Sequence, residues 1–237
     1  MDWSSRINTP SFEIARQGVL EGVEAFRQWA SVWNSQRPPD EPAGEWETFY
    51  DDWPALNTAV IRLLQASSPA QWDAPLIEAL LYAIARDNEM ECIKQDLVGS
   101  PSHLIALAGH AVNCDDPDAR WQLADALGSP DLSDEQVEPL LERFVHDDDE
   151  YVSRRALLAL SARRSPKTEQ LAVRAWETGH EYQRMVALDV LFEASSPLTS
   201  IYIDKCKSIE QEHLRARAQE LSARLKTAQN ARRCDED

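Results

Sequence analysis

The stretch DDDEYVSRRALLALS, residues 147–161, opens with four consecutive acids and then turns apolar. An acidic metal-binding loop ahead of a helix, or one copy of a repeat, would give this pattern. Comparing the chain with itself decides between them. The segment EYVSRRALLAL (150–160) aligns with EYQRMVALDVL (181–191), with EHLRARAQELS (212–222) and with PDARWQLADAL (117–127). Self-similarity at a fixed period of about 20–50 residues indicates a solenoid, and periods of about 30–47 suit two-helix repeats. The acids therefore lie where one helix turns into the next.

Helical periodicity covers nearly the whole chain. We expect helices over 10–34 and 52–66, separated by a Pro-rich loop at 35–45. Helix pairs are expected at 72–85 with 88–98, 102–112 with 117–128, 133–145 with 149–162, 165–177 with 180–193, and 197–207 with 211–227. Ser–Pro steps separate the pairs, because Ser caps a helix and Pro fits its first turn. The predicted organisation is a helical N-terminal cap over 1–66, a repeat array over 67–229 and a frayed tail over 230–237.

The segment DDPDARWQLADALG (115–128) resembles the second half of a HEAT repeat, in which an acid-rich turn precedes a Val-Arg pair, an Ala-Leu pair and a terminating Gly. DDEYVSRRALLALS (148–161) is similar, with Ser153 in place of the Arg, which Arg184 and Arg215 restore. The resemblance covers about residues 69–227. It implies an all-α, right-handed α-solenoid of about five HEAT-like helix pairs, with the second helices lining the concave surface. It also implies that the aligned arginines pair with turn acids between adjacent repeats. Folds of this kind serve many roles, so function needs a site.

Acidic and basic residues are unevenly distributed along the chain, whose net charge is −17. Residues 69–150 contain 19 acids and 4 bases, a net charge of −15, whereas residues 151–237 contain 12 acids and 15 bases, a net charge of +3. Such a polarised field repels nucleic acid from the middle of the chain and attracts basic proteins to it. Solubility alone is the alternative explanation for any single acid.

Each second helix has a face opposite the one predicted to be buried, given about 100° of rotation per residue. In the first clear copy that face carries Asp118, Trp121 and Asp125. The aligned residues are Tyr151, Arg154 and Leu158, then Tyr182, Met185 and Asp189, then His213, Ala216 and Glu220. Trp, Tyr, Arg and Met are enriched at protein interfaces, so we expect Trp121 to project from the inner wall as an anchor. Alternatively, Trp121 and Met185 pack under a neighbouring repeat.

The predicted partner-binding surface joins these columns to the turn acids. Its members are Asp115, Asp116, Asp118, Trp121, Asp125, Asp147, Asp148, Asp149, Glu150, Tyr151, Arg154, Tyr182, Met185 and Asp189. The partner expected from this composition is a basic protein. The narrowest hypothesis is an immunity protein that neutralises a basic, nuclease-type toxin. A scaffold, or a chaperone or lyase of the HEAT type that handles bilin chromophores, is a further possibility.

The sequence contains no complete motif for catalysis or for metal binding. An EF-hand needs alternating ligands and a Gly at its sixth position, which the acids at 147–150 lack. His180 and Glu181 resemble one His-Glu pair of the HEAT-type di-iron deoxyhypusine hydroxylases, which need several such pairs. His110 and Cys114, four residues apart, have no second pair beside them. No phosphate-binding Gly loop or dinucleotide fingerprint is present. We therefore expect no catalytic residue, cofactor or metal.

One enzymatic alternative remains open. HEAT-like alkylpurine DNA glycosylases hold a damaged nucleotide with Trp, Tyr and Asp on a concave surface, and Asp118, Asp125 or Asp189 would supply the acid here. The charge of residues 69–150 argues against it, because DNA binding depends on Lys and Arg that neutralise phosphates.

The sequence also predicts a cellular location. Cys92, Cys114, Cys206 and Cys234 form no CxxC pair, which is typical of free thiols in a reducing cytoplasm. The N-terminus lacks the pattern of a secretory signal, and the longest apolar run, at 76–85, is too short to cross a bilayer. We expect a cytoplasmic protein that is monomeric when free and touches neither membrane nor nucleic acid directly.

Overall fold

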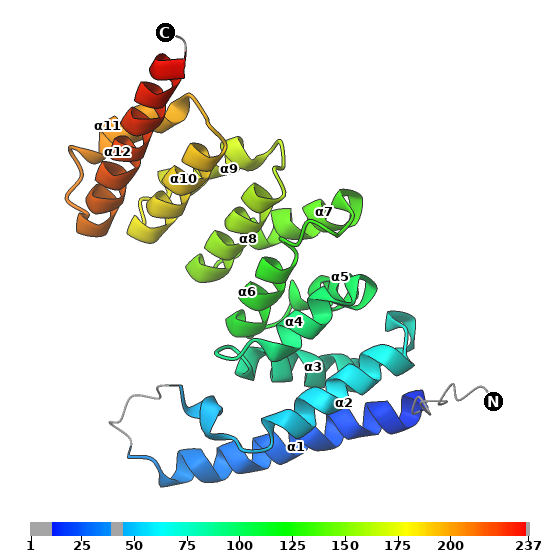
Figure 1. Ribbon diagram of the computed structural model, residues 1–237. Coiled ribbons are helices and arrows are strands. Elements are labelled where there is room, and N and C mark those ends of the chain that lie inside the picture. The colour runs from blue at the N-terminus through cyan, green and yellow to red at the C-terminus, as the bar shows by residue number, and fades with distance from the viewer. Residues whose placement is uncertain (1–10, 39–44, 236–237) are drawn as a thin grey trace. The chain divides into compact units, whose positions relative to one another are not determined.

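The computed structural model describes residues 11–38 and 45–235, with side chains through residue 227 (Figure 1). Within these residues it contains helices and no strands, so the all-α prediction is confirmed. The chain divides into two compact units, Met1–Leu127 and Gly128–Asp237. The division falls inside the predicted repeat array.

The first unit packs a long N-terminal helix against shorter ones. Helix α1 contacts α2 and α3, α2 contacts α4, and α6 contacts α3, α4 and α5. The elements are α1 (Phe12–Gln36), η1 (Trp46–Phe49), α2 (Trp53–Ala66), η2 (Pro69–Gln71), α3 (Ala74–Arg86), α4 (Cys92–Val98), α5 (Pro101–Ala111) and α6 (Pro117–Ala126). Most of the predicted Pro-rich loop lies between α1 and η1, and its residues 39–44 are outside the described part of the chain.

Aromatic side chains form the core between α1, η1 and α2. Phe26 is 1% exposed. Its ring centre lies within 6.1 Å of those of Trp29, Trp46, Tyr50, Trp53 and Tyr82. Trp53 also donates its indole N–H to the Glu47 carbonyl at 2.7 Å, which holds η1 against the start of α2. Such rings bury a large area and favour tilted or edge-on packing, so a few of them can build this end of the unit.

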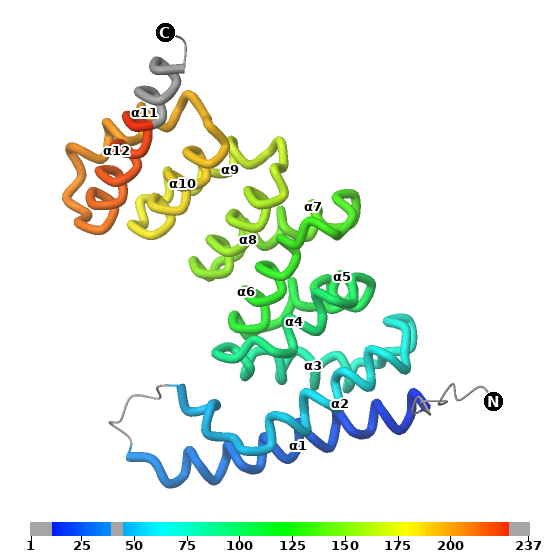
Figure 2. Tube along the Cα trace, viewed as in Figure 1, coloured from blue at the N-terminus to red at the C-terminus, as the bar shows by residue number. Residues whose placement is uncertain are grey.

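The second unit consists of helix pairs. Each first helix packs on the second helix that follows it, and α10 contacts both α8 and α12. The second helices α8, α10 and α12 thus form one layer, which can be followed along the trace in Figure 2. The helices are α7 (Asp134–Val145), α8 (Glu150–Ala162), α9 (Thr168–Glu177), α10 (Glu181–Glu193), α11 (Leu198–Cys206) and α12 (Glu212–Asp235).

Most helix boundaries lie within three residues of those predicted, but three expectations need correction. Helix α4 begins at Cys92 rather than at 88. Helix α12 continues to Asp235, beyond the predicted end at 227. The Ser–Pro steps act less uniformly than predicted. Ser68 forms a capping box with Gln71, whereas the Ser100 side chain makes no capping hydrogen bond. The helix after Ser129 begins only at Asp134, because Pro130 is followed by a further turn.

Candidate protein-docking surface

An exposed aromatic row follows the N-terminal ends of the second helices in the second unit. Tyr151, Tyr182 and His213 each occupy the second residue of α8, α10 and α12. Tyr151 is 40% exposed, Tyr182 is 47% exposed, and His213 is also exposed. Since the three helices lie side by side in one layer, the same position in each repeat produces a continuous row.

Arg154 lies between the two tyrosines. Its guanidinium carbon is 5.0 Å from the centre of the Tyr151 ring and 5.2 Å from that of Tyr182. Glu150 Oε1 lies 3.2 Å from Arg154 Nε, and the Tyr182 and His213 rings are 6.2 Å apart at an interplanar angle of 19°. A cation over an exposed aromatic face contributes about 0.5–1 kcal/mol. We call Tyr151, Arg154, Tyr182 and His213 the tyrosine ladder.

Hydrogen bonds at the helix starts fix the ladder in place. Asp149 accepts hydrogen bonds from the backbone N–H groups of Tyr151 at 2.9 Å and Val152 at 3.1 Å. For α12 the acceptor comes from the preceding repeat, because Glu181 Oε1 accepts from the N–H of His213 at 2.8 Å and of Leu214 at 3.2 Å. First-turn amides lack partners within their own helix, so these carboxylates both satisfy them and set the spacing of neighbouring helices.

The column of Arg120, Ser153 and Arg184 secures each second helix to the segment before it. The side chains donate to the carbonyls of Cys114 at 2.6 Å, Val145 at 2.7 Å and Trp176 at 3.2 Å, respectively. Arg184 also donates to Gln211 Oε1 at 3.1 Å, an amide where the resemblance implied a turn acid. Arg184 therefore makes the expected contact with the next repeat, but it donates to the neutral amide of Gln211 rather than to a carboxylate.

Trp121 is buried rather than exposed to solvent. Its side chain is 7% exposed, its indole N–H donates to Asp118 Oδ1 at 3.1 Å, and Lys94 Nζ lies 5.7 Å from its ring centre. The prediction that Trp121 projects into solvent is wrong. The alternative, packing under a neighbouring repeat, describes it better, because α6 is flanked by α4, which carries Lys94.

Asp125 and Asp189 occupy the same repeat column and hold neighbouring second helices together. Asp125 Oδ2 lies 2.9 Å from Nζ of the buried Lys94, and Asp189 Oδ1 accepts from Arg217 Nε at 2.6 Å. Burial raises the pKa of Asp189, and the hydrogen bond from Arg217 partly offsets this. Both acids were predicted to face a partner, yet each has an ion pair with an adjacent helix.

The turn acids divide into internal and outward-facing members. Asp116 pairs with Arg86 and accepts from the Asp118 N–H at 3.0 Å, and Asp147 accepts from the Asp149 N–H at 2.9 Å. Asp115 and Asp148 are exposed, whereas Met185 is half-buried. Much of the predicted acidic surface thus caps helices, although its charge still contributes to the field around the molecule.

His213 and Glu181 are the contributors missing from the predicted site. Both stand in repeat columns already visible in the sequence, beside Tyr182 and Glu150 of the other copies. The alignment already places His213 in the column of Tyr151 and Tyr182, although the predicted partner-binding surface omits it. The inter-repeat cap by Glu181 depends on the distance between α10 and α12, which sequence spacing does not provide.

A sequence profile described as HEAT repeats matches residues 104–191. This match supports a HEAT-like repeat protein. It extends from α5 to α10 and includes the Tyr151 and Tyr182 copies of the repeat. No curated protein and no solved structure matches the chain.

Metal binding and membrane insertion are two other possibilities for the described residues. No cluster of three or more His, Cys, Asp or Glu side chains there could hold a metal ion. In the same part of the chain, no helix has the length and apolar character needed to span a membrane. Cys92, Cys114 and Cys206 are free thiols, while the side chain of Cys234 lies outside the described ones.

Proposed function

We propose that the chain is a protein-interaction module whose tyrosine ladder docks a basic segment of another protein. HEAT repeats are typical of interaction and scaffold roles, and the match over residues 104–191 supports this class of function. The observation that carries the proposal is the exposure of Tyr151 and Tyr182 in a row held by Arg154 and His213. Rigid, exposed tyrosines lose little conformational freedom on binding, and Tyr and Arg dominate binding hot spots.

The chemistry of the ladder and its surroundings favours a cationic partner. Arg154 already demonstrates that a guanidinium fits over these rings, and Tyr182 and His213 offer further ring surface beyond it. Asp148 is exposed one residue before the cap of α8. Residues 151–237, which contain the ladder, have a net charge of +3, so the steering of basic proteins comes from the −15 of residues 69–150 and acts over a Debye length of about 8–10 Å.

A displayed library of random peptides tests the docking face. We expect wild-type protein to enrich peptides rich in Arg and Lys, and Tyr182→Ala to lose affinity for them about tenfold or more. Ile201→Ala is the matched control, because Ile201 is 51% exposed but lies on the first helix α11. Asp148→Lys should slow association and weaken its salt dependence. Equal binding by the wild type and Tyr182→Ala would exclude the ladder as the docking face.

A narrower proposal is that the basic partner is a toxin, such as a nuclease, which the chain neutralises. Its support is the acidic charge of residues 69–150, which would attract a basic enzyme and repel its nucleic-acid substrate. The test is a search for a toxin gene beside this one, followed by co-expression. Growth rescued by the wild type but not by Tyr182→Ala would support an inhibitory role. If Tyr182→Ala neutralised the toxin as well as the wild type, the tyrosine ladder would not be the surface that inhibits it.

We propose a non-catalytic role over the glycosylase alternative. Each candidate acid has one carboxylate oxygen engaged within the fold, because Asp118 accepts from Trp121, Asp125 pairs with Lys94 and Asp189 pairs with Arg217. These contacts support a structural role for the three acids. Excision of alkylated bases from duplex DNA by the purified protein, lost in Asp189→Asn, would overturn this preference.

A further inference from the structure

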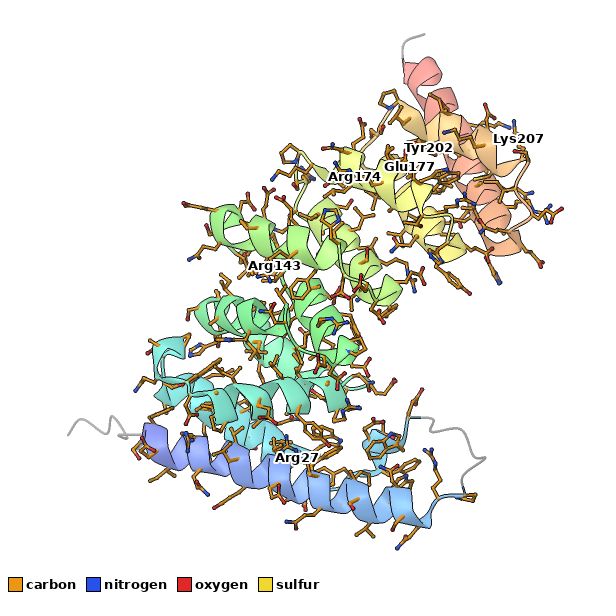
Figure 3. All side chains as sticks on the ribbon, turned by 180° about the vertical axis from the view of Figure 1, so that it is seen from behind. Arg27, Arg143, Arg174, Glu177, Tyr202 and Lys207 are labelled. Atoms are coloured by element: carbon orange, nitrogen blue, oxygen red, sulfur yellow. The ribbon has the colours of Figure 1, made fainter. Side chains whose placement is uncertain are left out.

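The last helix pair encloses a groove that has no role in the tyrosine ladder. It has a volume of about 500 Å³ and lies between α11 and α12. Its floor contains Ile203, Cys206 and Ala218, which are 7%, 2% and 4% exposed. The basic residues along its rim are Lys207, Arg215 and Lys226, all exposed. Figure 3 labels Lys207 at the C-terminal end of α11, the helix that carries Tyr202.

The repeat alignment explains where this groove comes from. Shifting its lining by 31 residues gives positions in the preceding pair, α9 and α10, that hold α11 and α12. Lys207 corresponds to Trp176, whose ring centre lies 4.8 Å from that of Tyr202, and Arg215 corresponds to Arg184, which donates to Gln211. The groove is therefore the surface on which a further helix pair would lie.

The outer face of α11 and α12 is hollowed and basic as well as polar. Terminal repeats need a polar outer face, which Gln219 and Ser222 supply where the preceding pair has the buried Leu188 and Leu191. A polar outer face does not need to be hollowed. The groove is present here because the small Ala223 stands where the preceding pair has the larger Phe192. Nor does a polar outer face require a basic rim in a chain of net charge −17, because acids improve solubility more.

We propose that this groove binds an acidic amphipathic helix of a partner protein, in the place that a further repeat would occupy. An amphipathic helix can lay its apolar face on a floor such as Ile203 and Ala218, and the rim then selects for carboxylates. Arg184 contacts Gln211, the residue just before α12, so Arg215 is placed to contact the start of the bound helix. The ion pair of Lys207 with Asp204 is exposed and contributes little, which leaves Lys207 able to change partners.

Two synthetic helical peptides test the proposal, one built from Leu and Glu and the other from Leu and Lys. The net charge of the protein repels the first and attracts the second, so saturable binding of the Leu/Glu peptide would occur against the overall field. We expect Lys207→Glu and Ala223→Trp each to weaken that binding about tenfold or more. The first change reverses a rim charge and the second fills the groove.

Arg174→Glu is the matched control, because Arg174 is exposed on α9 and lies outside the groove (Figure 3). It should leave the affinity for the Leu/Glu peptide unchanged, and circular dichroism should show that each variant keeps its helix content. Absence of saturable binding, or equal losses in Lys207→Glu and Arg174→Glu, would overturn the proposal. Neither result bears on the tyrosine ladder, which the Tyr182→Ala comparison tests separately.

Discussion

The two units bury the repeat column of Trp121 to different depths. In the first unit, Phe26 and its neighbours form the core beneath α1, and Trp121 of α6 is buried. In the second, the aligned Arg154 and Met185 are half-buried, and Tyr151 and Tyr182, three residues before them, are exposed. A repeat column therefore specifies a place in the fold, while the neighbouring helices decide whether that place is buried.

Replacing a core ring should break the first unit most severely. Phe26→Ala removes the ring at the centre of the aromatic cluster, and we expect it to lower the free energy of unfolding by about 3–5 kcal/mol. Phe49→Ala is the control, because that ring is 62% exposed and stacks on Trp33 alone among the described aromatics. Urea unfolding measures both variants. Similar small losses for the two would contradict an aromatic core centred on Phe26.

The contrast between the columns is sharpest for Trp121 and Tyr182. Trp121→Ala should cost about 3 kcal/mol of stability, because it leaves a cavity and an unpaired Asp118. Tyr182→Ala should cost only about 0.5–1 kcal/mol, because it removes an exposed cation–π contact with Arg154 and no core packing. Thermal unfolding of the two variants compares them directly. A Trp121→Ala protein as stable as the wild type would contradict the burial of Trp121.

The sequence predicts the second unit well because one pattern repeats there. The match of Glu150, Glu181 and Glu212 locates three helix starts at once, and each start has a tyrosine or histidine beside it. The aromatic positions of the tyrosine ladder can thus be identified from the alignment. Its hydrogen bonds are not, because the reach of Glu181 to the amides of α12 depends on how closely the helices pack.

The first unit is less predictable from sequence because its contacts are not periodic. The burial of Trp121 depends on Lys94 of α4, a residue that no alignment of the repeats connects to it. The packing of η1 depends on Trp53 and Phe26, which are distant in sequence and follow no repeat. Helical periodicity still identifies α1 and α2, since their apolar stripes face inward over several turns.

A buried acid gives the first unit a pH dependence of its own. Asp87 is 2% exposed and accepts from the Ile93 N–H at 2.7 Å, and burial raises its pKa to about 6. The folded state thus binds a proton more tightly than the unfolded state, where an Asp pKa is about 3.9. Its burial therefore costs stability at neutral pH, and that cost disappears as the pH falls from about 6 to about 4.

Asp87→Asn removes this charge with little change in shape. We expect it to stabilise the first unit by about 1–2 kcal/mol at pH 7 and to lose that advantage near pH 4. Urea unfolding of the variant and the wild type across this range isolates the contribution of Asp87 from the other carboxylates. A difference between the two proteins that stays constant with pH would show that Asp87 does not titrate in this window.

A smaller effect is expected at the column that secures the second helices. Ser153→Ala removes the 2.7 Å hydrogen bond to the Val145 carbonyl, which is buried, and should cost about 1 kcal/mol. Ser161→Ala, at a half-buried position near the end of α8, serves as the control. If both variants unfold at the wild-type urea concentration, the hydrogen bond of Ser153 contributes nothing measurable to the second unit.

Amide hydrogen exchange tests the docking face most directly. The protein would be labelled alone and with a saturating Arg-rich peptide selected from the library. First-turn amides have no acceptor within their own helix, so occlusion by a ligand changes their exchange readily. We predict slower exchange over 150–154, 181–185 and 212–216, with little change in the first helices α9 and α11. Protection confined to α9 and α11, or to the first unit, would contradict the assignment of the tyrosine ladder as the docking face.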